Sequence, residues 1–164
     1  MTEFKSFGAF AKHLLRTAVI GEEVSHHITA EGAKIIQRDA QAKLGVYQEA
    51  VGPFPEWAEL ADSTKADRVA QGFTENDPLR RSGGLAESIE VHALGNDAVV
   101  GSQDPVALWQ EEGTTQGGAP HIPPRPFLGP AAFGAKRPIG VMAANTMVAW
   151  IAGKGWLRPA KLIE

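Results

Sequence analysis

The sequence contains no cysteine, and this absence excludes a disulfide-stabilised scaffold, a thiolate metal site and a cysteine nucleophile. It also contains no apolar run close to the roughly 20 residues that a membrane-spanning helix needs. Residues 1–10 lack the basic start and the apolar core of a signal peptide. We therefore expect a soluble protein that is made in the cytoplasm and does not contact a membrane.

Positive charge is not in excess either. The 164 residues include 16 Lys and Arg against 19 Asp and Glu, which gives a formal net charge of −3 and a pI near 6.0. Proteins that bind nucleic acid over their whole surface carry clustered Lys and Arg, so we do not expect such a protein, although local basic patches stay open. A chain of 164 residues with 43% hydrophobic content predicts a single domain with a core, spanning 1–164.

The common motifs of catalytic and metal sites are missing. No Gly-x-Ser-x-Gly sequence occurs, and the Gly-rich loop 112–120 lacks the Gly-Lys-Ser/Thr ending of a phosphate-binding loop. His26 and His27 are adjacent, so a helix would point them about 100° apart and they could not share one ion. Glu111 and Glu112 would lie on opposite faces of a strand, which is poor geometry for a pair of catalytic carboxylates. We predict no enzyme, no cofactor and no metal site, although residues distant in sequence can converge in space.

Helical periodicity is present at both ends of the chain. Residues 2–19 and 22–44 carry apolar side chains at spacings of three and four, which predicts two N-terminal helices, the second roughly 34 Å long. The apolar stripe of the first helix needs a packing partner. A similar pattern predicts a C-terminal helix over 131–152 that starts late because of Pro138. Residues 153–164 are a tail containing Gly and Pro.

The middle of the chain divides into a loop region and a β region. Residues 45–84 are rich in turn formers, with a short helix predicted at 64–71 from a capping box. Such a long irregular segment is either functional, ordering against a neighbour, or an irregular surface loop held by Trp57. Alternation and turn signals predict strands at 88–92, 98–101 and 106–110, with the Pro-rich stretch 122–130 as a stiff edge. The predicted fold is α+β: long N-terminal helices packed on a small antiparallel β-sheet in region 85–130, with long loops and a C-terminal helix.

The Pro-rich stretch contains one cation and one aromatic residue among four prolines, in the order Pro123-Pro124-Arg125-Pro126-Phe127-Leu128-Gly129-Pro130. Each proline fixes φ near −65° and removes a backbone donor, so the segment is stiff. One interpretation is that Arg125 and Phe127 contact another subunit. The other is that Arg125 forms a salt bridge within its own domain and that Phe127 is a core aromatic, worth about 3–5 kcal/mol on truncation to Ala.

Four short motifs occur in order between residues 53 and 130. They are Pro53 followed by Trp57-Ala58-Glu59-Leu60, then Leu79-Arg80-Arg81-Ser82-Gly83-Gly84-Leu85-Ala86-Glu87-Ser88-Ile89, then Val100-Gly101-Ser102 with Ala107 and Glu111-x-Gly113-Thr114, and finally Ile122-Pro123-Pro124-Arg125-Pro126-Phe127-Leu128-Gly129. This order resembles the phage virion-morphogenesis family of small tail-completion, or head–tail neck, proteins. The resemblance covers about half of the chain.

The resemblance implies a structural virion protein of a tailed bacteriophage without catalytic activity. Such a protein forms a homo-oligomeric ring in the neck or tail of the virion, after assembly in the host cytoplasm, and joins the tail to the head. Its partners would be copies of itself and neighbouring head-completion, tail-terminator or tail-tube proteins, with DNA passing through and no sequence-specific binding. A small phage-encoded hydrolase or a DNA-binding accessory factor stays open as an alternative.

A ring requires two different complementary surfaces on each subunit. Loops 45–84 and 113–121 and the stiff Pro-rich edge could supply them. The candidate subunit-contact residues are Arg125, Pro126, Phe127, Trp57, Glu111, Glu112 and Thr114.

Overall fold

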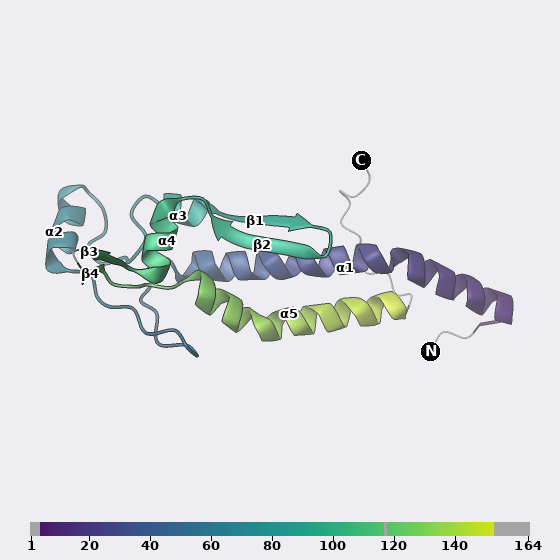
Figure 1. Ribbon diagram of the computed structural model, residues 1–164. Coiled ribbons are helices and arrows are strands. Elements are labelled where there is room, and N and C mark those ends of the chain that lie inside the picture. Colours follow the sequence, from purple (N-terminus) through teal and green to yellow (C-terminus); the bar gives the residue numbers. More distant parts are fainter. Residues whose placement is uncertain (1–3, 117, 153–164) are drawn as a thin grey trace.

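The computed structural model describes residues 4–116 and 118–152 and shows an elongated molecule organised along one helix (Figure 1). Helix α1 (Phe7–Lys43) runs along most of its length, and helix α5 (Leu128–Ile151) packs beside it. A hairpin of β1 (Ile89–Leu94) and β2 (Asp97–Ser102) lies against another side of α1. The α+β class is confirmed. Among the described residues, no helix is both long and apolar enough to cross a bilayer.

Helix α1 is a single element, so the prediction of two N-terminal helices is wrong. Its 37 residues correspond to about 55 Å, and the Ser6 side chain caps its start by accepting a hydrogen bond from the Ala9 N–H at 3.2 Å. The predicted break at Gly21 is instead a point of close approach, because a Cβ there would lie 3.3 Å from the Trp150 ring. Gly32 likewise faces Ile139. Packing against α5 compensates for the weak helix propensity of both glycines.

Helix α5 starts at Leu128, three residues before the predicted start, and continues through Pro138 to Ile151. The prediction of a late start is wrong because the first turn has its N–H groups bound by a side chain from elsewhere in the chain, described below. The neighbours of Gly21, Gly32 and Gly134 show that α5 runs antiparallel to α1, since Gly134 approaches Asp39. The predicted tail 153–164 lies outside the described residues.

The hairpin confirms the first two predicted strands. β1 and β2 pair antiparallel from Ile89 opposite Ser102 to Leu94 opposite Asp97, and Gly95 in the turn adopts φ +62°. Ile89 is buried, and its carbonyl accepts a 2.7 Å hydrogen bond from the Gln37 side chain of α1. The hairpin is thereby fixed on the helix.

The predicted third strand at 106–110 is wrong, because this segment forms helix α4 (Pro105–Glu112). The Asp104 side chain caps the Val106 N–H at 2.9 Å, and a proline at the first helical position favours a helix start. The sheet is therefore two separate pairs, the second formed by β3 (Thr114–Gln116) and β4 (Ala119–Ile122). The Pro-rich stretch is paired only as far as Ile122.

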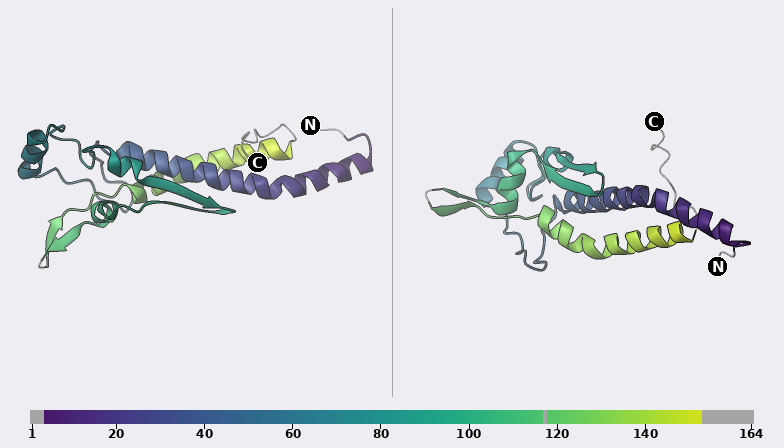
Figure 2. Two further views of the ribbon diagram at one scale, coloured as in Figure 1. Left: turned by 90° about the horizontal axis from the view of Figure 1, so that it is seen from above. Right: turned by 45° about the vertical axis from the view of Figure 1, so that its right-hand side comes forward.

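The remaining elements lie at the end of the molecule that carries α4. Helix α2 (Asp62–Ala70) begins two residues before the predicted 64, without a side-chain cap, and α3 (Gly84–Glu87) is a single turn before β1. The core lies where α1, α4 and α5 meet, and its buried residues are Ala40, Leu44, Trp57, Ile89, Ala107, Phe127 and Ala131. Figures 1 and 2 show that this end is broad, whereas the first turns of α1 extend alone at the other end.

Candidate subunit-contact site

Five of the seven predicted contact residues come together in a buried junction, which we define as Trp57, Glu111, Arg125, Pro126 and Phe127. Phe127 has no exposed surface and Trp57 is only 5% exposed. The Trp57 indole N–H donates to the Pro126 carbonyl at 2.9 Å, so a loop 69 residues earlier is attached to the Pro-rich stretch. The interpretation of Phe127 as a core aromatic is confirmed.

Arg125 is buried, and its hydrogen bonds stay within its own chain. Its Nε and Nη2 donate to the Ala58 carbonyl at 3.0 and 2.9 Å, and Nη2 also donates to the Glu59 carbonyl at 3.0 Å. The predicted intrachain salt bridge is wrong in its chemistry, because these acceptors are backbone carbonyls. Burial lowers the pKa of the Arg125 guanidinium below its ordinary value. Replacing Arg125 with Glu would therefore disturb folding before it tested a subunit contact.

Glu111 binds the backbone at the start of α5, a role that the prediction of a strand did not indicate. Its Oε2 accepts hydrogen bonds from the N–H groups of Phe127 at 2.7 Å and Leu128 at 3.0 Å, and its Oε1 accepts from Gly129 at 2.8 Å. These donors belong to the start of α5, where the helix dipole favours an anion. Glu111 is thus the N-terminal cap of α5, supplied from α4.

Two glycines let the backbone close around this cap. A Cβ on Gly129 would lie 2.5 Å from the Phe54 ring and 3.2 Å from Oε1 of Glu111. Gly113 adopts φ +75°, and a Cβ there would lie 2.7 Å from the Ile122 carbonyl oxygen. Both sites leave no room for a side chain. The motif sequences Glu-x-Gly and Phe-Leu-Gly are accordingly parts of one packed arrangement.

The other two predicted contact residues lie outside the junction. Glu112 is exposed on α4, about 100° around the helix from Glu111. Thr114 starts β3 and is half-buried, and its hydroxyl has no hydrogen-bond partner among the described residues. Of the seven candidates, only Glu112 is both exposed and free to contact a neighbouring subunit without rearrangement.

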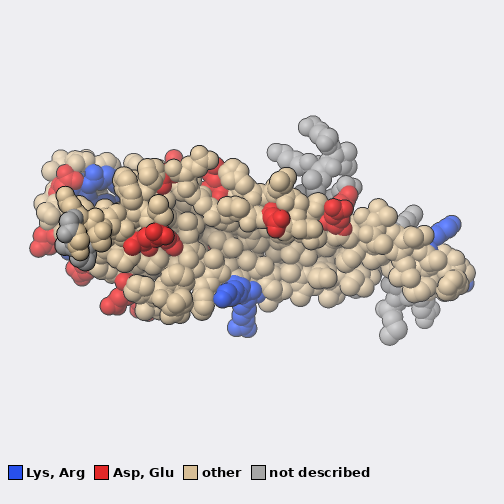
Figure 3. All heavy atoms as spheres, in the orientation of Figure 1, with Lys and Arg blue, Asp and Glu red and all other residues tan. Residues whose placement is uncertain are grey.

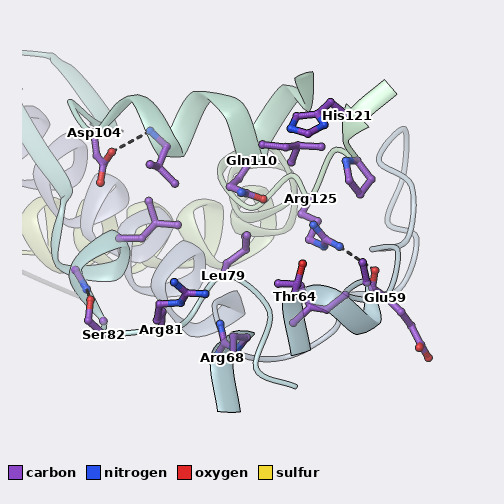
Figure 4. A pocket seen from close by; sticks show the side chains of 18 residues that line it. Glu59, Thr64, Arg68, Leu79, Arg81, Ser82, Asp104, Gln110, His121 and Arg125 are labelled. Atoms are coloured by element: carbon purple, nitrogen blue, oxygen red, sulfur yellow. Dashed lines mark hydrogen bonds between the residues drawn. The ribbon is translucent and has the colours of Figure 1, made fainter. Parts of the chain in front are cut away.

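A cavity of about 650 Å³ adjoins the junction, between α2, α4 and the start of the Pro-rich stretch (Figure 4). Arg68, Arg81, Arg125 and His121 line it together with Gln110. Arg68 is 4% exposed and donates to the carbonyls of Thr74 at 2.7 Å and Arg80 at 2.6 Å. Sequence reasoning missed this second buried arginine, because nothing in the spacing around it distinguishes it from a surface arginine.

Sequence reasoning also missed where the apolar surface would be left exposed. The first turns of α1 expose Phe7 (83%), Leu15 (68%) and Val19 (78%). Helix α4 exposes Leu108 and Trp109. The helical stripe of residues 4–18 was the available signal for the first group, because it needs a packing partner that α5 does not reach far enough to supply.

No metal centre is formed by the described residues, since they contain no group of three His, Asp or Glu side chains arranged to hold an ion. Comparison of the chain with protein-family models, with curated proteins and with solved structures finds no match.

Proposed function

We propose that this chain is a structural subunit of a tailed-bacteriophage virion, a tail-completion or neck protein that forms a ring joining the tail to the head and lets DNA pass. The observation that carries the proposal is the amount of apolar surface that the folded chain leaves uncovered. Large apolar side chains that are more than half exposed occur on α1, the hairpin, α4 and α5. Exposed apolar surface of this extent is typical of proteins that bury it in an assembly.

The accessible surface area supports the same conclusion. The chain exposes 11231 Å², whereas a folded monomer of 17.5 kDa exposes about 7,900 Å² by the usual scaling with mass. The 16 residues outside the described ranges could account for at most about 2,500 Å², the value for fully extended chain. The described part is therefore still larger in surface than a compact monomer, which suits a subunit that is completed by neighbours.

The motifs behind the resemblance give independent support, because they converge in space. Trp57, Glu111, Arg125 and Phe127 come from three of the four motifs and all belong to the junction. Motifs that pack together in one folding unit support the resemblance more strongly than four short matches at unrelated places would. In this proposal the junction is the scaffold of the subunit, and the contacts between subunits are made by the exposed surfaces around it.

An acidic surface also fits the passage of DNA. Low affinity for phosphates follows from the scarcity of clustered Lys and Arg, so DNA would slide through such a ring without adhering. Loops 45–84 and 113–121 remain candidates for contacts with the neighbouring neck and tail proteins. Figure 2 shows the β3–β4 pair extending away from the body, which places it well for such a contact.

The test is a phage that encodes this chain, with the gene interrupted by a stop codon. We expect DNA-filled heads and finished tails that stay separate in electron micrographs of the lysate, and joined particles when the intact gene is supplied from a plasmid. Joined, infectious particles without the protein would contradict the proposal. A defect in lysis or in DNA packaging with tails attached would favour the hydrolase or DNA-binding alternative.

A further inference from the structure

The N-terminal part of α1 continues beyond its packing partner. Helix α5 reaches Gly21, where the Trp150 ring lies against the backbone, and α1 continues for another four turns toward Phe7. We call residues 7–20 the arm; at 1.5 Å per residue it is about 21 Å long. Its exposed apolar side chains are Phe7, Phe10, Leu14, Leu15 and Val19. Figures 1 and 2 show the arm projecting from the body in every view.

The arm differs in charge from the rest of the chain. Residues 7–20 contain Lys12 and Arg16 and no Asp or Glu, whereas residues 21–164 contain 13 Lys and Arg against 18 Asp and Glu. In Figure 3 the arm end shows basic side chains only, and acidic side chains gather over the broad end of the molecule. A basic apolar helix on an acidic body is electrostatically complementary to a second copy of that body.

The broad end carries an apolar surface that matches the arm. Pro105, Leu108, Trp109 and Glu112 recur at spacings of three and four, so they form one outward stripe of α4. Leu108 is 58% and Trp109 46% exposed, and Glu112 at the end of the stripe is exposed. Ala107 and Glu111, on the other side of α4, belong to the core and the junction. We call this stripe the α4 face.

We propose that the arm of one copy docks on the α4 face of the next copy, with Lys12 beside Glu112 and the surrounding acidic surface. This inference rests on the proposed ring and names the two surfaces that would close it. The arm and the α4 face lie at opposite ends of the molecule (Figure 1). The arm of a chain therefore cannot reach the α4 face of the same chain. A contact between two different surfaces is heterologous, and repeating it gives a closed ring or an open filament.

Other possible binding partners of the arm match its positive charge less well. Residues 153–164 of the same chain contain three Lys or Arg and one Glu, so their charge has the same sign as that of the arm. An anionic lipid surface would attract the positive charge of the arm, but it would leave the α4 face uncovered. A second copy covers both exposed surfaces with one contact.

The test uses two variants that each damage one surface. The arm variant carries Lys12→Glu and Leu15→Gln, and the face variant carries Leu108→Gln and Glu112→Gln; all four positions are exposed, so both variants should fold, as circular dichroism would verify. The control variant carries Glu90→Gln and His92→Gln, two exposed positions on one face of β1 whose replacement removes charge but no large apolar side chain. Oligomeric mass is measured by native mass spectrometry and analytical ultracentrifugation over a range of concentrations.

We expect the unaltered chain and the control variant to form the same large assembly, and each surface variant to associate at least about tenfold more weakly. A mixture of the two surface variants should form a one-to-one dimer and nothing larger, because it retains one intact arm and one intact α4 face. A dimer that forms only in the mixture is expected for a head-to-tail contact and not for a contact between identical surfaces.

Two results would overturn the inference and leave the ring in place: assembly of the arm variant or the face variant as well as the unaltered chain, or failure of the mixture to form the dimer. Loss of binding to anionic lipid vesicles by the arm variant, with assembly unchanged, would assign the arm to a membrane instead. An unaltered chain that is monomeric at all concentrations and absent from virions would contradict both the inference and the proposed function.

Discussion

The two ends of this molecule use similar residue types in opposite ways. At the broad end, Trp57 and Phe127 are buried in one core cluster, and Arg125 and Glu111 bind backbone groups from distant parts of the chain. At the other end, Phe7, Leu15 and Val19 are exposed to solvent on a helix without a packing partner along most of its surface among the described residues. The comparison indicates that the junction maintains the fold of one subunit, whereas the arm is available for assembly.

This difference predicts how the ends respond to substitution. Changes in the junction should lower the free energy of unfolding of the isolated subunit. Changes in the arm should leave that free energy almost unchanged and affect association.

The largest effect is expected for Phe127→Ala. Phe127 has no exposed surface and packs in the core with Trp57 and Ile89, so truncation leaves a cavity. We expect the free energy of unfolding to fall by about 3–5 kcal/mol, measured by urea denaturation of the subunit at low concentration. A loss below about 1 kcal/mol would mean that the junction is not the core of the fold.

Two glycine substitutions in α5 are expected to change the stability of the subunit in opposite directions. Gly129→Ala would place a Cβ 2.5 Å from the Phe54 ring, and we expect a loss of about 1–3 kcal/mol from overpacking. Gly140→Ala, in the same helix with no heavy atom within 4 Å of its Cβ position, should instead stabilise the subunit by up to about 1 kcal/mol. Thermal unfolding of both variants tests the pair, and equal signs would contradict the packing described for the start of α5.

The cap of α5 should show a smaller effect. Glu111→Gln keeps the size of the side chain but removes the negative charge that faces three N–H groups, so we expect a loss of about 1–2 kcal/mol. Glu112→Gln is the matched control on the exposed side of α4 and should change stability by less than about 0.5 kcal/mol. Urea denaturation measures both, and similar values for the two variants would remove the capping role.

The smallest effect on stability is expected in the arm. Leu15 is 68% exposed, and Leu15→Gln should change the free energy of unfolding of the dilute monomer by less than about 0.5 kcal/mol. The same variant should remain soluble at higher concentration than the unaltered chain. A loss above 1 kcal/mol would show that the arm packs within its own subunit, and the contrast between the two ends would then disappear.

Much of the fold could be predicted from local patterns. The hairpin has alternating residues and a Gly-Asn turn, and the helices have clear periodicity, so these elements follow from signals within a few residues. Two of the errors, at Gly21 and at the start of α5, occurred where distant contacts decide the outcome. Gly21 stays helical because Trp150 packs on it, and α5 starts early because Glu111 caps it.

The candidate site shows the same limit. The stiffness of the Pro-rich stretch and the burial of Phe127 could be inferred from the residue types alone. The hydrogen-bond partners of Arg125 could not be inferred, because they are the backbone carbonyls of residues 58 and 59. Every residue has a backbone carbonyl, so the sequence does not indicate which one accepts a hydrogen bond. The α4 face was concealed for a different reason: the segment 106–110 was predicted as a strand, so its outward stripe could not be recognised.

The most direct test of the account is the mass of the purified, unaltered chain in solution and in virions, obtained by native mass spectrometry and by imaging of the neck. We predict a closed ring whose mass is an integral multiple of 17.5 kDa, located where the tail meets the head. A chain that stays monomeric across all concentrations and is missing from virions would contradict the account.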